Sequence, residues 1–253
     1  KHTERLFNSA RILGMDIPFD SDTLNQAQRD VVKKNNLNSA YIRPMCFYGS
    51  EGMGLRADNL KVHVMIAAWE WGSYLGDDNM KNGIRIRKSS YIRHHAHPDL
   101  SGAKMNGNYI NSIMALKEAQ SHGFDEALML DVEGSVSEGS GENIFVIKDE
   151  VLYTPHLSSA LPGITRDTIF TLAKSLGHKV IEKKISCEDI YQADEAFFTG
   201  TAAEVTPIRD LDGNQIGIGS RGPITEKLQS LYFDCVHGRN EDYKYWIESG
   251  RCS

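Results

Sequence analysis

The order in which helical and extended patterns follow one another constrains the fold of this chain more than any other feature of its sequence. Apolar residues recur at helical spacing before residue 40, after residue 104, after Pro162 and after residue 223. Between these stretches lie short runs of β-branched and aromatic residues bounded by turn signals, which predict strands. Because strands and helices do not alternate strictly, the pattern favours an α+β fold over a doubly wound parallel sheet.

Caps and turn residues set the expected limits of these elements. We predict helices that end at Gly14, span 22–34, run from Lys104 to Gly123, extend from Pro162 to Gly177, and span 224–238. We predict strands over residues 40–48, 61–71, 84–87, 127–132, 143–148 and 151–154, with a hairpin turn at Asp212-Gly213.

A local change of composition divides the chain. Residues 72–83 are rich in glycine, aspartate and asparagine, which is typical of a connection between domains. We therefore expect a small domain over residues 1–72, an interdomain loop over 73–83 and a larger, cofactor-binding domain over 84–253. The length of 253 residues is sufficient for two domains with separate cores.

Composition excludes several classes of function. The formal net charge of −6 leaves no basic excess of the kind that nucleic-acid binding needs. No apolar run approaches the length of a membrane span, and the N-terminus shows no signal-peptide pattern. The four cysteines, Cys46, Cys187, Cys235 and Cys252, lie far apart without a CxxC motif, which indicates reduced thiols in a cytoplasmic protein. We expect neither nucleic acid nor membrane among its partners.

The stretch 101–112, SGAKMNGNYINS, is the first candidate for chemistry. It places Lys104 among small residues, which leave room for a planar ring near the backbone. An amine that forms a Schiff base must be neutral part of the time, and burial or nearby positive charge can arrange this. Taken alone, Lys104 is better explained as a solvated surface amine. Four further motifs accompany it: SVSEGSGEN (135–143), LPGITRD (161–167), Gly200-Thr201-Ala202 and YIRP (41–44).

Two other kinds of site are not supported. The glycines of 139–141 suggest a dinucleotide-binding loop, but Ile144 occupies the sixth position of the GxGxxG pattern, and no GxxxxGK[ST] loop is present. His94, His95 and His97 suggest a metal site. However, adjacent histidines on a strand point to opposite faces, and no carboxylate or cysteine completes the set at ligand spacing. We therefore predict no nucleotide site and no metal.

Together and in this order, the five motifs resemble those of the branched-chain amino acid aminotransferases, which are fold-type IV pyridoxal phosphate enzymes. The resemblance extends from HTERL (2–6) to GPITEKLQ (222–229). It implies a small N-terminal α/β domain, incomplete here, a larger C-terminal domain, and an active site between them. It also implies that about fifty N-terminal residues are lacking, because the chain opens inside an amphipathic helix without a methionine or a cap.

The resemblance implies pyridoxal 5′-phosphate as cofactor and assigns residues to it. Lys104 is the catalytic residue: it binds the cofactor covalently and then moves the proton between the substrate and the cofactor. Glu138 pairs with the ring nitrogen and keeps it protonated, as an electron sink requires. Tyr109 bonds to the ring oxygen. Without the resemblance, Glu138 is better explained as a helix-capping or surface glutamate, and Tyr109 as a tyrosine at the start of an amphipathic helix.

The same resemblance assigns the cofactor phosphate to three separate segments. Arg5 offers a bidentate guanidinium contact. Ile164 and Thr165 stand at a predicted helix N-terminus, where free N–H groups and the helix dipole favour an anion. Thr201 adds a hydroxyl in a tight turn. Each alone is explained by a solvated arginine, an ordinary N-cap or an ordinary turn, so the argument lies in their combination.

Substrate contacts follow from the resemblance as well. Tyr41 and Arg43 alternate on a predicted strand and so share a face, which suits recognition of a substrate carboxylate. The residues implied for the rest of the substrate site are Trp71, Tyr74, Thr201 and Ala202, with Met53 and Leu55 on a loop contributed by the neighbouring subunit. Ordinary core or interface packing explains such aromatic and apolar residues equally well.

The expected function is therefore transamination of branched-chain L-amino acids (Leu, Ile, Val) with 2-oxoglutarate, giving branched 2-oxo acids and glutamate. The resemblance implies a homodimer or homohexamer. Two alternatives stay open: a D-amino acid aminotransferase or aminodeoxychorismate lyase of the same fold, and a non-catalytic binding protein. The RHHAHP stretch (93–98) departs from the family, which usually has small residues and prolines there.

Overall fold

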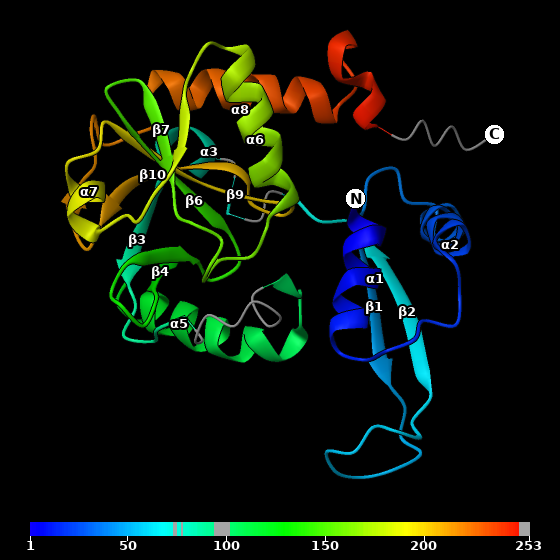
Figure 1. Cartoon of the computed structure of the whole chain (residues 1–253). Coiled ribbons are helices and arrows are strands. Elements are labelled where there is room, and N and C mark those ends of the chain that lie inside the picture. The colour runs from blue at the N-terminus through cyan, green and yellow to red at the C-terminus, as the bar shows by residue number, and fades with distance from the viewer. Residues whose placement is uncertain (73–74, 77, 94–101, 248–253) are drawn as a thin grey trace. The chain divides into compact units, whose positions relative to one another are not determined.

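The structure, a computed structural model, describes residues 1–72, 75–76, 78–93 and 102–247 (Figure 1). The described chain divides into two compact units. Unit 1 consists of Lys1–Gly72 together with Gly102–Met105, and unit 2 contains the other described residues. The predictions made for Tyr74, His94, His95 and His97 fall outside the described residues.

Unit 1 is built from two helices and a hairpin. Its elements are α1 (His2–Ile12), α2 (Ser21–Lys34), β1 (Tyr41–Tyr48) and β2 (Val62–Trp69). Asp20 caps α2, because its side chain accepts a hydrogen bond from the amide of Thr23 at 2.8 Å. The strands pair antiparallel with Arg43 opposite Ala67, while α1 packs on β1 and α2 on β2. The predicted helices and strands of this unit are confirmed.

Unit 2 is organised around a mixed sheet. Its described strands are β3 (Ile84–Lys88), β4 (Glu126–Leu130), β5 (Val136–Gly139), β6 (Asn143–Lys148), β7 (Val151–Thr154), β8 (Val180–Glu182), β9 (Glu195–Gly200), β10 (Glu204–Leu211) and β11 (Asn214–Gln215). Their order is β5-β4-β3-β10-β9-β6-β7-β8, with β11 paired to β10. Strand β3 runs parallel to both β10 and β4, whereas β9 pairs antiparallel with β10 and β6. This mixture confirms the predicted α+β class.

Helices cover both faces of this sheet. The described helical elements of unit 2 are α3 (Asn79–Asn82), η1 (Asn106–Asn108), α5 (Tyr109–Ser121), α6 (Ile164–Ser175), α7 (Cys187–Tyr191), α8 (Pro223–Val236) and η2 (Glu241–Trp246). Helices α6 and α8 pack together beside β9, and α5 packs on β4 (Figure 1). Successive residues of β9 point to opposite faces, so Phe197 joins the core under α6 and α8 while Phe198 joins the core that contains Ile190 of α7.

Several boundaries differ from the sequence-based expectation. The helix expected from Lys104 begins at Tyr109, after the 3₁₀ turn of η1. The helix expected from Pro162 begins at Ile164, with Gly163 as its N-cap. The strand expected over 127–132 ends at Leu130, because the side chain of Asp131 accepts hydrogen bonds from the amides of Glu133 and Ser135 and forms a turn.

Candidate active site

The segment that carries Lys104 is fastened to α1 in unit 1. The backbone amide of Lys104 donates a hydrogen bond to Ser9 Oγ at 3.0 Å, and Ala103 is fully buried. The side chain of Lys104 is exposed. Because Ser9 is itself buried on α1, the helix that bears Arg5 also holds the backbone of the predicted catalytic lysine in place.

Positive charge gathers around this segment. Partial desolvation, followed by the charges of Arg5, the terminal amine and Lys104, lowers the pKa of His2 to about 4. Both predicted cofactor residues therefore lie near enough to His2 to repel its protonated form. A neutral histidine beside two cations suits the binding of an anion such as a phosphate ester.

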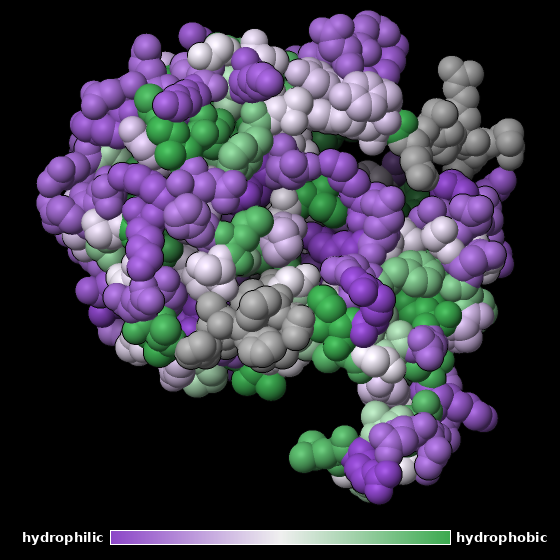
Figure 2. All heavy atoms as spheres, viewed as in Figure 1, coloured by the Kyte–Doolittle hydropathy of each residue, from purple (hydrophilic) through white to green (hydrophobic). Residues whose placement is uncertain are grey.

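A second cluster in unit 1 surrounds Arg43. Its guanidinium lies 5.4 Å from the ring centroid of Tyr41 and 5.3 Å from that of Trp69. Tyr41 also contacts Trp71 edge-on, with the ring centroids 4.6 Å apart. These rings restrict the arginine while leaving it exposed, so its charge is available to a carboxylate. Met53 and Leu55 lie elsewhere in the unit, fully exposed on the β1–β2 loop, where apolar surface is visible in Figure 2.

Among the predicted site residues in unit 2, Glu138 on β5 has contacts to both of its carboxylate oxygens. Only 4% of it is exposed. Its Oε1 forms an ion pair with Arg93 at 2.7 Å, and its Oε2 accepts hydrogen bonds from the amide of Leu161 at 3.1 Å and from Asn143 Nδ2 at 3.3 Å. A cation and two further N–H donors beside a buried carboxylate stabilise its negative charge. The negatively charged form is the one needed to keep a ring nitrogen protonated.

Arg93 connects Glu138 to the start of α5. Its Nη1 donates to Ser112 Oγ at 3.2 Å, and its backbone amide donates to the carbonyl of Leu130 at 2.7 Å. Ser112 lies one helical turn after Tyr109, so the two side chains share a face of α5. The half-buried Tyr109 is thereby on the side of α5 that faces the Arg93–Glu138 pair.

The N-terminus of α6 adjoins the same carboxylate. Gly163 is the N-cap and provides no side-chain hydrogen bond, so the first amides of the helix have no side-chain cap. A Cβ at Gly163 would collide with Asn143 Oδ1, and Asn143 Nδ2 also donates to the carbonyl of Leu161 at 2.9 Å. Ile164 and Thr165 are therefore placed beside Glu138, at the end of a 12-residue helix where an anion is favoured.

The turn that carries Thr201 lies near the glycine-rich turn. A Cβ at Gly200 would lie 3.7 Å from the carbonyl oxygen of Gly141, and β9 pairs with β6 so that Thr199 is opposite Asn143. Thr201 is exposed and Ala202 half-buried. Unit 2 thus brings together Tyr109, Glu138, Ile164, Thr165 and Thr201, while unit 1 brings together Lys104 with Arg5.

The site includes residues that the sequence does not single out. In the sequence Arg93 is only the first residue of RHHAHP, and no local pattern pairs it with Glu138. Asn143 closes the SVSEGSGEN motif, so that motif already contains the residue that bonds to Glu138. Trp69 has the pattern of an ordinary strand residue, and its role beside Arg43 becomes visible only from the pairing of β1 with β2.

Within the described residues, no group of three histidine, cysteine, aspartate or glutamate side chains is arranged to hold a metal ion. Nor is any described helix long and apolar enough to cross a membrane.

The arrangement fits a phosphorylated aromatic cofactor. Unit 2 provides a buried carboxylate paired with Arg93 and, beside it, a helix N-terminus without a side-chain cap. Comparison with protein families agrees with this chemistry, because the sequence model of the amino-transferase class IV family matches residues 1–211. The chain belongs to the class IV aminotransferase family.

Individual members of the family are similar over almost the whole chain. A branched-chain-amino-acid aminotransferase from Pseudomonas aeruginosa is 61% identical over 245 residues, which cover 97% of this chain and 80% of the relative. One with the same name from Escherichia coli K12 is 46% identical over 98% of this chain and 81% of its own length. The crystal structure of the branched-chain amino acid aminotransferase from Thermobaculum terrenum in its PLP-form superposes with a TM-score of 0.91 at 33% identity, covering 98% of this chain and 80% of that one. The predicted family and fold type are confirmed.

Proposed function

We propose that this chain catalyses pyridoxal phosphate-dependent transamination of branched-chain L-amino acids with 2-oxoglutarate, giving branched 2-oxo acids and glutamate. The names of its relatives and the cofactor present in the similar structure support this assignment. The observation that carries it is the buried Glu138, held by Arg93 and placed beside the uncapped N-terminus of α6. The carboxylate suits a protonated ring nitrogen, and the helix N-terminus suits a phosphate.

When bound, pyridoxal phosphate supplies an electron sink that stabilises negative charge at the substrate α-carbon. Glu138 would hold a proton on the ring nitrogen, and Arg93 is paired with that carboxylate at 2.7 Å. Tyr109 would donate a hydrogen bond to the ring oxygen. Lys104 would hold the cofactor through its amine and would accept the proton from the substrate α-carbon.

The remaining predicted residues bind rather than transfer protons. The phosphate is assigned to the Arg5 guanidinium, the amides of Ile164 and Thr165, and the Thr201 hydroxyl. The substrate carboxylate is assigned to Arg43 and Tyr41, whose packing against Trp69 limits the motion of the arginine.

The apolar substrate side chain is assigned to Trp71 and Tyr74, with Thr201 and Ala202 completing the pocket. Rings of this size exclude water and bind an isobutyl or sec-butyl group through apolar contact.

Borohydride reduction followed by peptide mass spectrometry tests the assignment of the lysine. Reduction converts the imine to a stable amine, so we expect one pyridoxyl adduct, on the peptide that contains Lys104. An adduct on another lysine, or none, would overturn the assignment. Activity with L-leucine but not with D-alanine or aminodeoxychorismate would separate this proposal from the other reactions of the same fold.

We also infer a cytoplasmic homodimer or homohexamer. The scattered cysteines support a reducing compartment, and the fully exposed Met53 and Leu55 on the β1–β2 loop support a contact with a second subunit. Sedimentation of the purified protein measures the oligomeric state, and a monomer at micromolar concentration contradicts this inference.

A further inference from the structure

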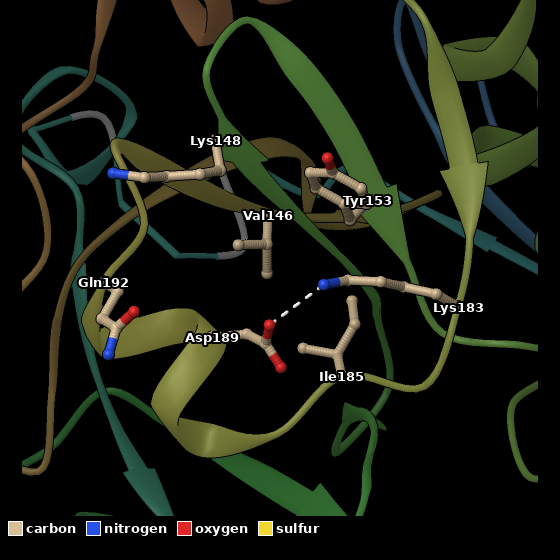
Figure 3. Close-up of a pocket in the computed structure, with 7 residues that line it drawn as sticks. All are labelled: Val146, Lys148, Tyr153, Lys183, Ile185, Asp189 and Gln192. Carbon is tan, nitrogen blue, oxygen red and sulfur yellow. Dashed lines mark hydrogen bonds and ion pairs between the residues drawn. The ribbon is translucent and has the colours of Figure 1, made fainter.

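A small pocket beside α7 contains charged side chains that the proposed reaction does not use. Its volume is about 120 Å³, and in it Lys183 lies 3.0 Å from Asp189 Oδ1 (Figure 3). The amine of Lys148 points away from the space that Lys183 enters, and is paired with Asp194 at 2.9 Å (Figure 3). The charges of this pocket are therefore balanced within the protein.

Glu142 is another charged residue that the proposed reaction does not use, and it lies next to the predicted site. It belongs to the SVSEGSGEN motif that also contains Glu138, and only 5% of it is exposed. Burial of a carboxylate is costly unless hydrogen bonds or opposite charges stabilise it. The contacts that Glu142 makes in this buried position therefore indicate its role.

The glycine-rich turn 139–142 is closed by Glu142. Its Oε2 accepts a hydrogen bond from the amide of Gly141 at 3.0 Å, and its carbonyl oxygen accepts one from the amide of Gly139 at 2.7 Å. Two amides of the turn are therefore directed at Glu142. Because Gly139 follows Glu138 directly at the end of β5, these bonds fix the backbone beside the Glu138 carboxylate.

The side chain of Glu142 lies between this turn and the turn that carries Thr201. A Cβ at Gly139 would lie 2.7 Å from Glu142 Oε2, so glycine at that position leaves the room that the carboxylate occupies. A Cβ at Gly200 would lie 3.7 Å from Glu142 Cγ, which is an ordinary van der Waals distance. Since Thr201 follows Gly200, Glu142 is close to both segments.

We propose that Glu142 is a positioning residue that sets the spacing between Glu138 and Thr201. This inference rests on the proposed function, which assigns Glu138 to the ring nitrogen and Thr201 to the phosphate of one cofactor. A rigid ring fixes the separation of those two groups, so both contacts form fully only when the spacing of the two segments matches it. Residues that support such a site must hold it to within about 0.5 Å.

Comparison of pyridoxal phosphate with pyridoxal tests this role. Pyridoxal has the same ring and aldehyde but no phosphate, so its binding does not depend on the spacing. Titration of the cofactor-free protein, followed by the absorbance of the imine formed with Lys104, gives the Kd of each compound. The Kd of pyridoxal divided by that of pyridoxal phosphate is the phosphate preference. The ³¹P NMR shift of bound pyridoxal phosphate reports on the same contact independently.

Variants at Glu142 make the test specific. Glu142→Met keeps a side chain of similar length but cannot accept the bond from Gly141, so the phosphate preference should fall about tenfold. Glu142→Asp keeps the charge but is one methylene shorter, and should give a similar fall even if the methionine variant does not fold. Glu142→Gln retains an acceptor oxygen at the same length and should restore the wild-type preference. Glu188→Met, at an exposed glutamate on α7, is the matched control and should change nothing.

Failure of this inference is distinguishable from failure of the proposed function. A wild-type protein that forms no imine at Lys104 with either compound overturns both. A wild type that binds pyridoxal phosphate, with an unchanged phosphate preference in the methionine and aspartate variants, overturns the role of Glu142 alone. Weaker binding of both compounds by the same factor also overturns it, because such a loss does not depend on the phosphate.

Discussion

Arg93 and Glu138 form a buried ion pair. Neither charge is solvated by water, so each is stabilised by the opposite charge of its partner. Glu138 also has the amide of Leu161 and the side chain of Asn143, whereas Arg93 has Ser112. Such a pair contributes little net stability compared with apolar packing, but removal of one partner leaves a charge buried without compensation. The two residues should therefore be far more sensitive to single substitution than to joint substitution.

Substitution of Arg93 by methionine should lower the free energy of unfolding by about 3–5 kcal/mol, because Glu138 then remains charged and buried. Adding Glu138→Gln should recover part of the loss. The exposed pair of Arg239 and Asp234, 2.8 Å apart, is the control, and Arg239→Met should cost less than about 1 kcal/mol. Urea unfolding measures all three. Equal losses for the single and the double variant would show that the charge is not the cause.

The buried carboxyl group of Glu126 should make the free energy of unfolding depend on pH. It is fully buried, and desolvation raises its pKa to about 7 although hydrogen bonds from Ala127 and Ser140 oppose the shift. In the unfolded chain the carboxyl ionises near 4.5. Between these values the folded state holds the proton and the unfolded state does not, so stability is full below pH 4.5 and falls as pH rises toward 7.

Glu126→Gln removes this titration. Its free energy of unfolding relative to the wild type should therefore rise by about 3 kcal/mol between the two pKa values and stay constant at higher pH. Urea unfolding at several pH values checks the difference, with Glu70→Gln on the exposed surface as the control. A difference that does not change with pH would mean that Glu126 ionises normally in the folded protein.

At the scale of single residues, motifs located Glu138, Ile164 and Thr165 but not the residues that hold them. The partnership of Arg93 with Glu138 depends on how the chain after β3 passes the end of β4, where the Arg93 amide bonds to Leu130. No local pattern encodes a contact between segments so far apart. A buried arginine is also rare enough that exposure is the default expectation for Arg93.

Among the elements, α6 joins the two halves of the proposed cofactor site in unit 2. Its N-cap, Gly163, lies where any Cβ would press on Asn143, whose amide bonds both to Leu161 and to Glu138. The backbone angles of Gly163 are available to any residue, so the requirement for glycine at this position is steric, not conformational. Asn143 therefore links the position of the start of α6 to the position of the Glu138 carboxylate.

Gly163→Ala should cost about 1–3 kcal/mol, because Asn143 must move away from the new methyl group. Gly163→Ser has the same Cβ but can cap α6, so an equal loss in that variant assigns the effect to the collision. Gly107→Ala is the control, since no atom lies within 4 Å of its Cβ position. Thermal unfolding compares the three variants. Full recovery by serine would show that Asn143 tolerates a Cβ at this position.

The length and burial of an element decided whether it could be predicted from the sequence. Helices α2, α6 and α8 extend over three or more turns and show a complete apolar period. Helix α7 and strand β8 are too short to show one, and neither was predicted. Strand β9 was missed for another reason: Phe197 and Phe198 are both buried, on opposite faces of a central strand, so the apolar and polar alternation is absent.

At the scale of the whole molecule, the predicted cofactor residues are divided between the two units. Lys104 is flanked in sequence by segments of unit 2, yet its segment belongs to unit 1, because its amide bonds to Ser9 on α1. A division of the sequence by composition assigns each stretch to one domain and has no means of detecting such an exchange. The predicted boundaries at residues 72–83 stay a prediction, since they concern the chain connection and not these contacts.

This division predicts how cofactor removal affects unfolding. A ligand that binds only the folded state stabilises it by about 2.7 kcal/mol at a hundredfold excess over its Kd. The proposed function assigns Arg5 and Lys104 of unit 1, and Glu138 of unit 2, to one cofactor. We therefore expect removal of pyridoxal phosphate to lower the urea midpoint of both units. A cofactor bound by one unit alone would stabilise that unit only.

The three tryptophans make the two midpoints measurable. Trp246→Phe leaves Trp69 and Trp71, which report on unit 1, and the variant Trp69→Phe with Trp71→Phe leaves Trp246, which reports on unit 2. Fluorescence-detected unfolding of each variant, with and without the cofactor, gives four midpoints. Lys104→Met should diminish the stabilisation in both units, because the covalent link is lost. Stabilisation confined to unit 2 and unaffected by Lys104→Met would exclude unit 1 from cofactor binding.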